Sequence, residues 1–171
     1  QLLSVVIAAA ILSMCPAAQA DDIRIGTTLS LTGPYANYGK NALRGIELAI
    51  EEANREGPHT YKLIVEDFGT LDLKRAVGAI NKLIAVDKIQ LYLPLIVEDS
   101  EVTVPIAEKV PLFSMAVGCG ARQCGENIGK FHTRAPASHD EIIKQLVTVA
   151  TERKVQHACV VAAAATYFEG Y

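Results

Sequence analysis

The chain has 171 residues, half of them hydrophobic, and a formal net charge of −3 at pH 7. This length is enough for one domain with a core of its own. The small negative charge and the lack of a basic stripe give no reason to expect nucleic acid as a partner.

The first twenty residues have the features of a secretory signal peptide. They carry no charge, contain an apolar run from Val5 to Leu12, and end in Ala18-Gln19-Ala20, a small-x-small cleavage pattern. We therefore expect residues 1–20 to be removed after Ala20 and the mature chain to be periplasmic. A transmembrane anchor is the alternative, but the apolar run is short for a bilayer crossing. Because the segment has no initiator methionine and no basic region, we expect its start to be missing.

The mature chain opens with a strand, a loop and a helix. Apolar and polar residues alternate from Ile23, which predicts a strand up to Thr28. A turn-rich loop follows from Leu29 and is expected to close at Gly39. The helix is predicted from Lys40, with one apolar face made by Leu43, Ile46, Ile50 and Ala53.

The same order of strand, loop and helix then recurs. We expect strands at 61–67, 89–93, 110–115 and 157–163, a short strand or crossover at 130–134, and helices that follow Thr70, Asp99 or Ser100, and Ser138. Pro105 is expected either to kink the third helix or to move its start to Thr103. This alternation predicts an α/β fold, a Rossmann-like doubly wound parallel sheet.

Ligands of such sheets bind beyond the carboxyl ends of the strands. The sequence therefore predicts a ligand cleft walled by four loops: Leu29–Gly39, Phe68–Thr70, Pro94–Asp99 and Ala116–Cys124. The helices that follow point their N-termini at the same crevice, which suits an anionic or polar ligand group.

Three cysteines remain in the mature chain. Cys119 and Cys124 lie close together in a Gly-rich loop, and in an oxidising compartment their simplest pairing is with each other. Cys159 lies in an apolar run and is expected to be a buried thiol. A metal site that adds His132 or His139 to the cysteine pair is the alternative, but the spacing matches no familiar zinc ribbon. No metal or other cofactor is therefore expected.

Motifs for catalysis do not emerge from the sequence. The loop after the first strand has neither P-loop spacing nor a G-x-G-x-x-G pattern, and no G-x-S-x-G elbow occurs. Ser114 could act as a nucleophile only if a distant histidine reached it. We expect the four histidines (His59, His132, His139 and His157) to be solvated or capping, and the acidic pairs Glu66-Asp67 and Glu98-Asp99 to solvate loops and cap helices. The sequence therefore favours a protein that is not an enzyme.

Several short segments form a more specific combination: Gly26, Leu31–Gly39, Gly45–Ala49, Asn54, Pro105–Ser114, Phe131–Arg134 and Tyr167–Tyr171. In this combination the chain resembles the branched-chain amino-acid type of ABC-transporter solute-binding proteins, which have the periplasmic-binding-protein type 1 fold. The resemblance implies two lobes that close on a small-molecule solute, delivery of the solute to a membrane permease, no catalysis, and a monomer when complete. It maps residues 21–134 onto most of lobe one and 135–171 onto the start of a truncated lobe two.

The resemblance also suggests ligand-binding residues. Tyr38 matches an aromatic wall of the site and Tyr167 an aromatic of lobe two, whereas Val97 and Gly118 stand where amino-acid binders have a Ser and a Thr. Backbone groups of Ala116, Val117 and Gly118 are further candidates, and Asp99 and Ser100 head the third helix. Without the two hydroxyls an aromatic acid or an amide fits as well as an amino acid. The alternatives are a ligand-sensing ectodomain on the same fold and, third, an α/β enzyme.

Overall fold

The computed structural model describes residues 22–69, 72–120, 124, 129–159 and 161. Five parallel strands form one sheet in the order β2-β1-β3-β4-β5. The strands are β1 (Ile23–Leu29), β2 (Tyr61–Asp67), β3 (Leu91–Pro94), β4 (Phe113–Ala116) and β5 (His132–Arg134). The predicted α/β parallel sheet is therefore confirmed.

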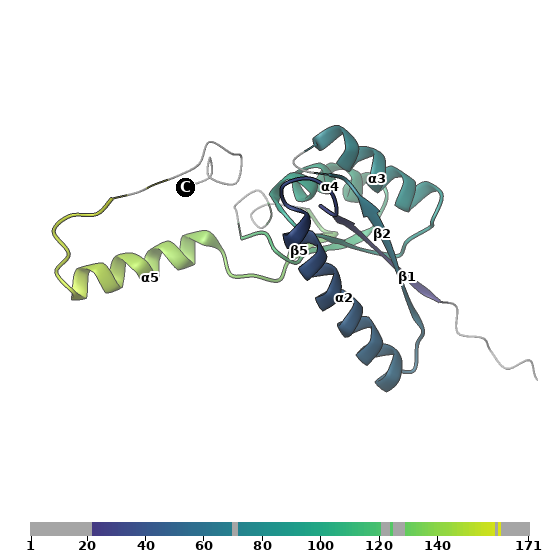
Figure 1. Ribbon diagram of the computed structural model, residues 1–171, viewed down its shortest axis with the longest axis horizontal. Coiled ribbons are helices and arrows are strands. Elements are labelled where there is room, and N and C mark those ends of the chain that lie inside the picture. Colours follow the sequence, from purple (N-terminus) through teal and green to yellow (C-terminus); the bar gives the residue numbers. More distant parts are fainter. Residues whose placement is uncertain (1–21, 70–71, 121–123, 125–128, 160, 162–171) are drawn as a thin grey trace, which may run out of the picture.

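Helices cover both faces of this sheet (Figure 1). The covering helices are α2 (Ala36–Glu56), α3 (Leu73–Ala85) and α4 (Val97–Lys109), and α5 (His139–Glu152) follows them in the chain. Helices α3 and α4 pack side by side on one face, and α2 lies against β1 and β2. This arrangement follows from the strand order, because the chain leaves β1 toward one edge of the sheet and then crosses back toward the other.

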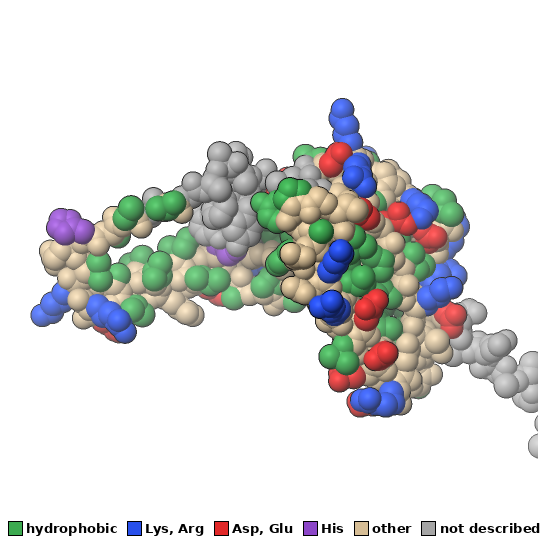
Figure 2. Space-filling view, viewed as in Figure 1, with side chains coloured by type: hydrophobic (Ala, Val, Ile, Leu, Met, Phe, Trp, Pro, Cys, Tyr) green, Lys and Arg blue, Asp and Glu red, His purple; other side chains and the backbone are tan. Residues whose placement is uncertain are grey.

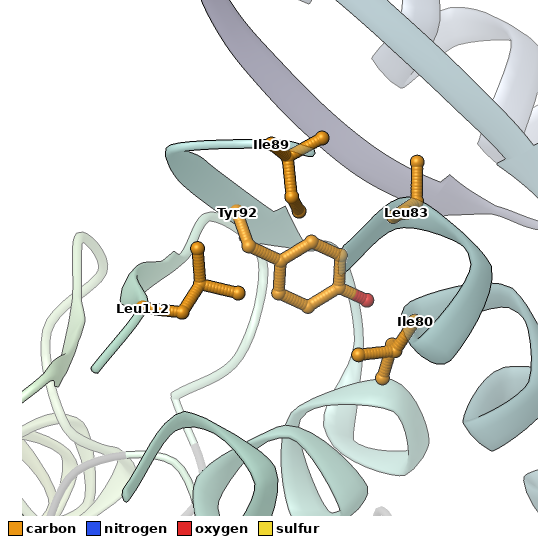
Figure 3. Packing of buried hydrophobic residues seen from close by; sticks show 5 residues of the cluster. All are labelled: Ile80, Leu83, Ile89, Tyr92 and Leu112. Atoms are coloured by element: carbon orange, nitrogen blue, oxygen red, sulfur yellow. The ribbon is translucent and has the colours of Figure 1, made fainter. Parts of the chain in front are cut away.

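The core lies between the sheet and helices α3 and α4. Figure 3 shows the ring of Tyr92 surrounded by Ile80, Leu83, Ile89 and Leu112, all buried. Burial of one large apolar side chain stabilises a fold by roughly 1.5–3 kcal/mol, so this cluster holds both helices to the sheet.

The start of α2 differs from the prediction. The helix begins at Ala36 rather than Lys40, and Gly39 is buried inside it instead of closing the loop. A Cβ on Gly39 would overlap the Ser30 carbonyl group, with the carbonyl carbon at 2.7 Å. Only glycine therefore lets this turn of the helix approach the end of β1 so closely. The predicted apolar face of α2 is the half-buried one.

The next boundaries are displaced by a few residues. Strands β3 and β4 end one residue later than predicted, and α4 begins at Val97 and continues through Pro105. Thr70 lies outside the described residues, and the side chain that caps α3 is Asp72, which accepts hydrogen bonds from two backbone N–H groups of the first turn.

The C-terminal region contains a predicted helix and lacks a predicted strand. Ser138 caps α5 through the N–H of Glu141, as the sequence predicted. The helix extends away from the sheet and buries none of its residues (Figure 1). Residues 157–159 are not a strand, and the remainder of 157–163 is outside the described residues apart from an exposed Val161. The prediction of a buried Cys159 is also wrong, since no described strand packs over it and its side chain is exposed.

Figure 2 shows apolar side chains along this extended arm. They include Ile142, Leu146 and Val147, each more than half exposed. Across the described residues, no helix is long and apolar enough to span a membrane.

Candidate functional site

The site is built at the carboxyl ends of β1, β3 and β4. The strand order reverses between β1 and β3, because the chain runs from β1 to β2 on one side and from β3 to β4 on the other. Parallel sheets bind ligands at such a switch point. Helices α2, α3 and α4 each begin at this edge, so their partly positive N-termini face it.

Asp67 at the end of β2 holds the loop that leads into α2. Its Oδ1 accepts the N–H groups of Leu31 and Gly69, both at 2.9 Å, and its Oδ2 accepts the Thr32 hydroxyl at 2.7 Å. Burial by itself would raise the pKa of Asp67, but these hydrogen bonds and the charge of Arg75 outweigh it and lower the pKa below its ordinary value. Asp67 is therefore a charged group that fixes the loop between β1 and α2.

Asp99 holds the turn between β3 and α4. Its carboxylate accepts the N–H of Leu95 at 2.8 Å and the N–H of Ile96 at 2.9 Å. It also accepts the hydroxyl of Thr28 on β1 at 2.8 Å, across the switch point. Burial raises the pKa of Asp99 to about 7, although the three hydrogen bonds act in the opposite direction and the charge of Glu98 adds to the rise.

Tyr38 and Gly118 come together at the open side of the edge. A Cβ on Gly118 would lie 3.2 Å from the Tyr38 hydroxyl and would overlap the Leu95 carbonyl oxygen. The Tyr38 ring is half exposed, and Gly118 is partly buried. Val117 next to it donates its N–H to the Pro94 carbonyl at 3.0 Å, which joins the loop after β4 to the end of β3. The Tyr38 ring, the turn after β3 and the loop after β4 thus form one wall.

Behind this wall lies a small apolar cluster. Val97 and Ala116 are fully buried against Cys119 and Cys124, which are joined in a disulfide with 6.0 Å between their Cα atoms. Ser100 is buried as well and donates its hydroxyl to the Ile96 carbonyl at 2.6 Å. The disulfide therefore closes the loop after β4 on itself, and its two cysteines pack against Val97 at the start of α4.

The structure brings seven of the eight residues suggested from the sequence to this one edge. Tyr38, Val117 and Gly118 have accessible surface there, whereas Val97, Asp99, Ser100 and Ala116 are buried beneath it. The eighth, Tyr167, lies outside the described residues. The pattern did not single out the bracing role of Asp67 or the hydroxyl of Thr28. For Asp67 the only signal was a carboxylate at a strand end.

A serine–histidine contact occurs elsewhere in the sheet. Ser114 Oγ on β4 lies 2.6 Å from His132 Nδ1 on β5. The prediction that His132 is solvated or capping is wrong, because pairing of β4 with β5 places its ring inside, where burial lowers its pKa. Both residues are buried, and His132 Nε2 has no hydrogen-bond partner among the described residues. A nucleophile needs an orienting acid for its histidine and an open approach, and within the described part of the chain this contact has neither. Among the described residues, no group of three or more His, Cys, Asp or Glu could hold a metal ion.

The sequence matches the family model described as "Periplasmic binding protein" over residues 22–170. The chain belongs to the periplasmic binding protein family. Within it, the chain resembles the branched-chain amino-acid type. The name of the family places its members outside the cytoplasm, and the family and its solved structures are solute-binding proteins rather than enzymes.

Individual relatives agree with this assignment. The Leu/Ile/Val-binding protein homolog 7 of Brucella suis is 30% identical over 89 residues, a match that covers 52% of this chain and 22% of the relative. A possible leucine/isoleucine/valine-binding protein from Rhodopirellula baltica superposes with a TM-score of 0.71 at 22% identity, over 81% of this chain and 38% of that one. A solute binding protein from R. palustris in complex with 4-hydroxybenzoate gives a TM-score of 0.68 at 18% identity, over 78% and 36%. The chain thus spans less than two fifths of the length of these relatives.

Proposed function

We propose that this chain provides the first lobe of an extracytoplasmic solute-binding protein of an ABC importer. In this proposal residues 21–134 form lobe one, residues from 135 onward begin lobe two, and a solute is captured between the lobes and delivered to a membrane permease. The observation that carries it is the convergence of Tyr38, the β3–α4 turn and the loop around Gly118 at the switch point of the sheet. Because a ligand touches both lobes only in the closed state, ligand binding would favour closure.

The solute we propose is a small carboxylate or amide: an amino acid, an aromatic acid or an amide of similar size. The N-termini of α2, α3 and α4 and the hydroxyl of Tyr38 offer hydrogen-bond donors to an acidic or polar group. The Tyr38 ring adds a flat apolar surface. Val97 and Gly118 contribute no hydroxyl, which favours recognition by backbone groups. Both solute classes occur among similar proteins. One relative is named for leucine, isoleucine and valine, and one solved structure contains 4-hydroxybenzoate.

We also propose that the mature protein is periplasmic and begins after Ala20. The apolar run from Val5 to Leu12 and the Ala18-Gln19-Ala20 pattern support this cleavage point. N-terminal sequencing of the protein recovered from periplasmic extract should return Asp21 as the first residue. An N-terminus within 1–20, or a protein that stays with the membrane, would contradict the proposal.

A thermal-shift panel on the whole gene product tests the proposed function. The panel contains aliphatic amino acids, aromatic carboxylates and short amides. A ligand that binds only the folded protein stabilises it by about 2.7 kcal/mol when its concentration is a hundred times its Kd, and this stabilisation raises the melting temperature. A shift with leucine or valine would assign amino acids, and a shift only with aromatic acids would assign the other class. No shift with any compound would count against solute capture.

A further inference from the structure

Four buried side chains form a ring beneath the site, and hydrogen bonds make three of its four links. The hydroxyl of Thr28 on β1 donates to Asp99, and the hydroxyl of Tyr92 on β3 contacts Thr28. Tyr92 also lies beside Thr103, whose hydroxyl donates to the backbone carbonyl of Asp99 at 2.5 Å. All four side chains are fully buried. The ring thus joins β1, β3 and α4 at the switch point of the sheet.

One carboxylate in this ring accepts three donors. Asp99 Oδ2 accepts the hydroxyl of Thr28 and the N–H of Leu95, and Oδ1 accepts the N–H of Ile96. An ionised carboxylate accepts all three donors at once, whereas a protonated one must donate through one of its oxygens. Because hydrogen bonds to a charged acceptor are stronger, the restraint on the turn at Leu95 and Ile96 depends on the charge state of Asp99.

The turn in question forms part of the wall of the site. The Leu95 carbonyl faces Gly118, next to the Tyr38 hydroxyl. Two residues later, Val97 packs on Ala116 and the disulfide. A displacement of this turn would therefore move two neighbouring parts of the wall together.

We propose that Asp99 is a positioning residue of the ligand site: as a carboxylate it holds the Leu95–Val97 turn against β1, and uptake of a proton releases the turn and weakens ligand binding. This inference rests on the proposed function, since it takes this edge of the sheet to be where the solute binds.

The surroundings of Asp99 place its titration in the neutral range. Burial raises its pKa to about 7, and the charge of Glu98 on the same helix adds to the rise. Tyr92 is the titratable group that faces it from β3, and burial together with the charge of Asp99 raises the pKa of Tyr92, which keeps it protonated. Among the described residues, no Lys, Arg or His forms an ion pair with Asp99.

Protonation has a defined consequence for the ring. A proton on Oδ2 turns that oxygen into a donor toward Thr28, so the Thr28 hydroxyl must reverse and donate to Tyr92, which can donate in turn to Thr103. The ring survives this reversal, but the N–H of Leu95 then faces a neutral hydroxyl, a weaker acceptor than a carboxylate. The restraint on the turn is therefore reduced without unfolding of the lobe.

The test measures affinity as a function of pH. Calorimetry on the whole gene product, with the ligand found by the thermal-shift panel, covers pH 5.5 to 8.5 for the wild type, Asp99→Asn and the control Glu98→Gln. We expect the wild-type Kd to rise at least fivefold as the pH falls across this range. Asp99→Asn should bind at least tenfold more weakly than the wild type at pH 8.5 and show a flat profile, whereas Glu98→Gln should keep a pH-dependent one. A wild-type profile in Asp99→Asn would overturn the proposal.

A second measurement does not need a ligand. Hydrogen exchange of the Leu95 and Ile96 amides should show protection at least tenfold lower in Asp99→Asn than in the wild type. If no compound in the panel binds, the proposed function fails, but the exchange result still decides whether Asp99 holds the turn. Unchanged protection in Asp99→Asn would overturn the positioning role of Asp99. If Asp99→Asn does not fold, Thr28→Val replaces it. This variant removes one hydrogen-bond donor to the Asp99 carboxylate, so the pH at which amide protection is half lost should be higher than in the wild type. An unmoved midpoint would contradict the proposal.

Discussion

Two glycine-to-alanine changes in helix α2 should alter stability in opposite directions. Gly39 and Gly45 lie six positions apart in the same helix. In a helix, alanine is favoured over glycine by about 0.8–1.0 kcal/mol, so propensity alone predicts that both variants are stabilised. The structure separates them, because a Cβ on Gly45 meets nothing within 4 Å, whereas one on Gly39 overlaps the Ser30 carbonyl and lies 2.7 Å from its carbon.

The expected magnitudes follow from these contacts. Gly45→Ala should raise the free energy of unfolding by about 0.5–1 kcal/mol. For Gly39→Ala the neighbour is backbone at the end of β1 and cannot rotate away, so an overpacking cost of about 1–3 kcal/mol or more should exceed the gain in propensity. Urea unfolding followed by circular dichroism measures both. If Gly39→Ala proved as stable as Gly45→Ala, the close approach of α2 to β1 would be refuted.

Three further outcomes are expected. Gly118→Ala should weaken ligand binding about tenfold, a loss of about 1.4 kcal/mol, because its Cβ would overlap the backbone of the neighbouring turn; Gly78→Ala, which meets nothing within 4 Å, should leave the calorimetric Kd unchanged. Asp72→Ala removes the cap of α3 and should lower the urea-derived stability by about 1 kcal/mol; no loss would show that the cap is dispensable. Cys119 and Cys124 should resist alkylation by iodoacetamide, measured by mass spectrometry, until reduced; ready labelling of both in oxidised protein would argue against the bond.

The affinity of the site should also respond to the assay buffer. Because Asp99 is expected to titrate near neutral pH, a panel run only in acidic buffer would underestimate the affinity of every ligand. The panel should therefore be run at pH 8 and again at pH 6. A ligand that is intrinsically weak gives a small thermal shift at both pH values, whereas a ligand weakened by protonation of Asp99 gives a larger shift at pH 8.

Local patterns in the sequence were enough to determine the class of fold. Alternating apolar residues marked β1, and the helical period marked the face of α2 that is half-buried in the fold. Ser138 marked the start of α5 because an N-cap acts within one turn of its helix. These features need only neighbours in the chain, so they can be recognised without the fold.

The failures of the prediction came from contacts between distant segments. Thr28 and Asp99 are 71 positions apart, and Ser114 and His132 are 18 apart, so no local pattern shows that their side chains meet. The same holds for Gly39, which looked like a loop residue until the fold placed the backbone of Ser30 against it.

The sequence by itself thus determined a parallel α/β fold, because periodicity and turn residues act locally. Only the tertiary structure decided what each residue does at the carboxyl ends of the strands. It left Tyr38 partly exposed and buried Val97 and Asp99 beneath the surface. It also gave one carboxylate three donors, from β1 and from the turn after β3. The physical reason is that burial and hydrogen bonding depend on what the sheet order brings together, and this order is set by packing across the whole lobe.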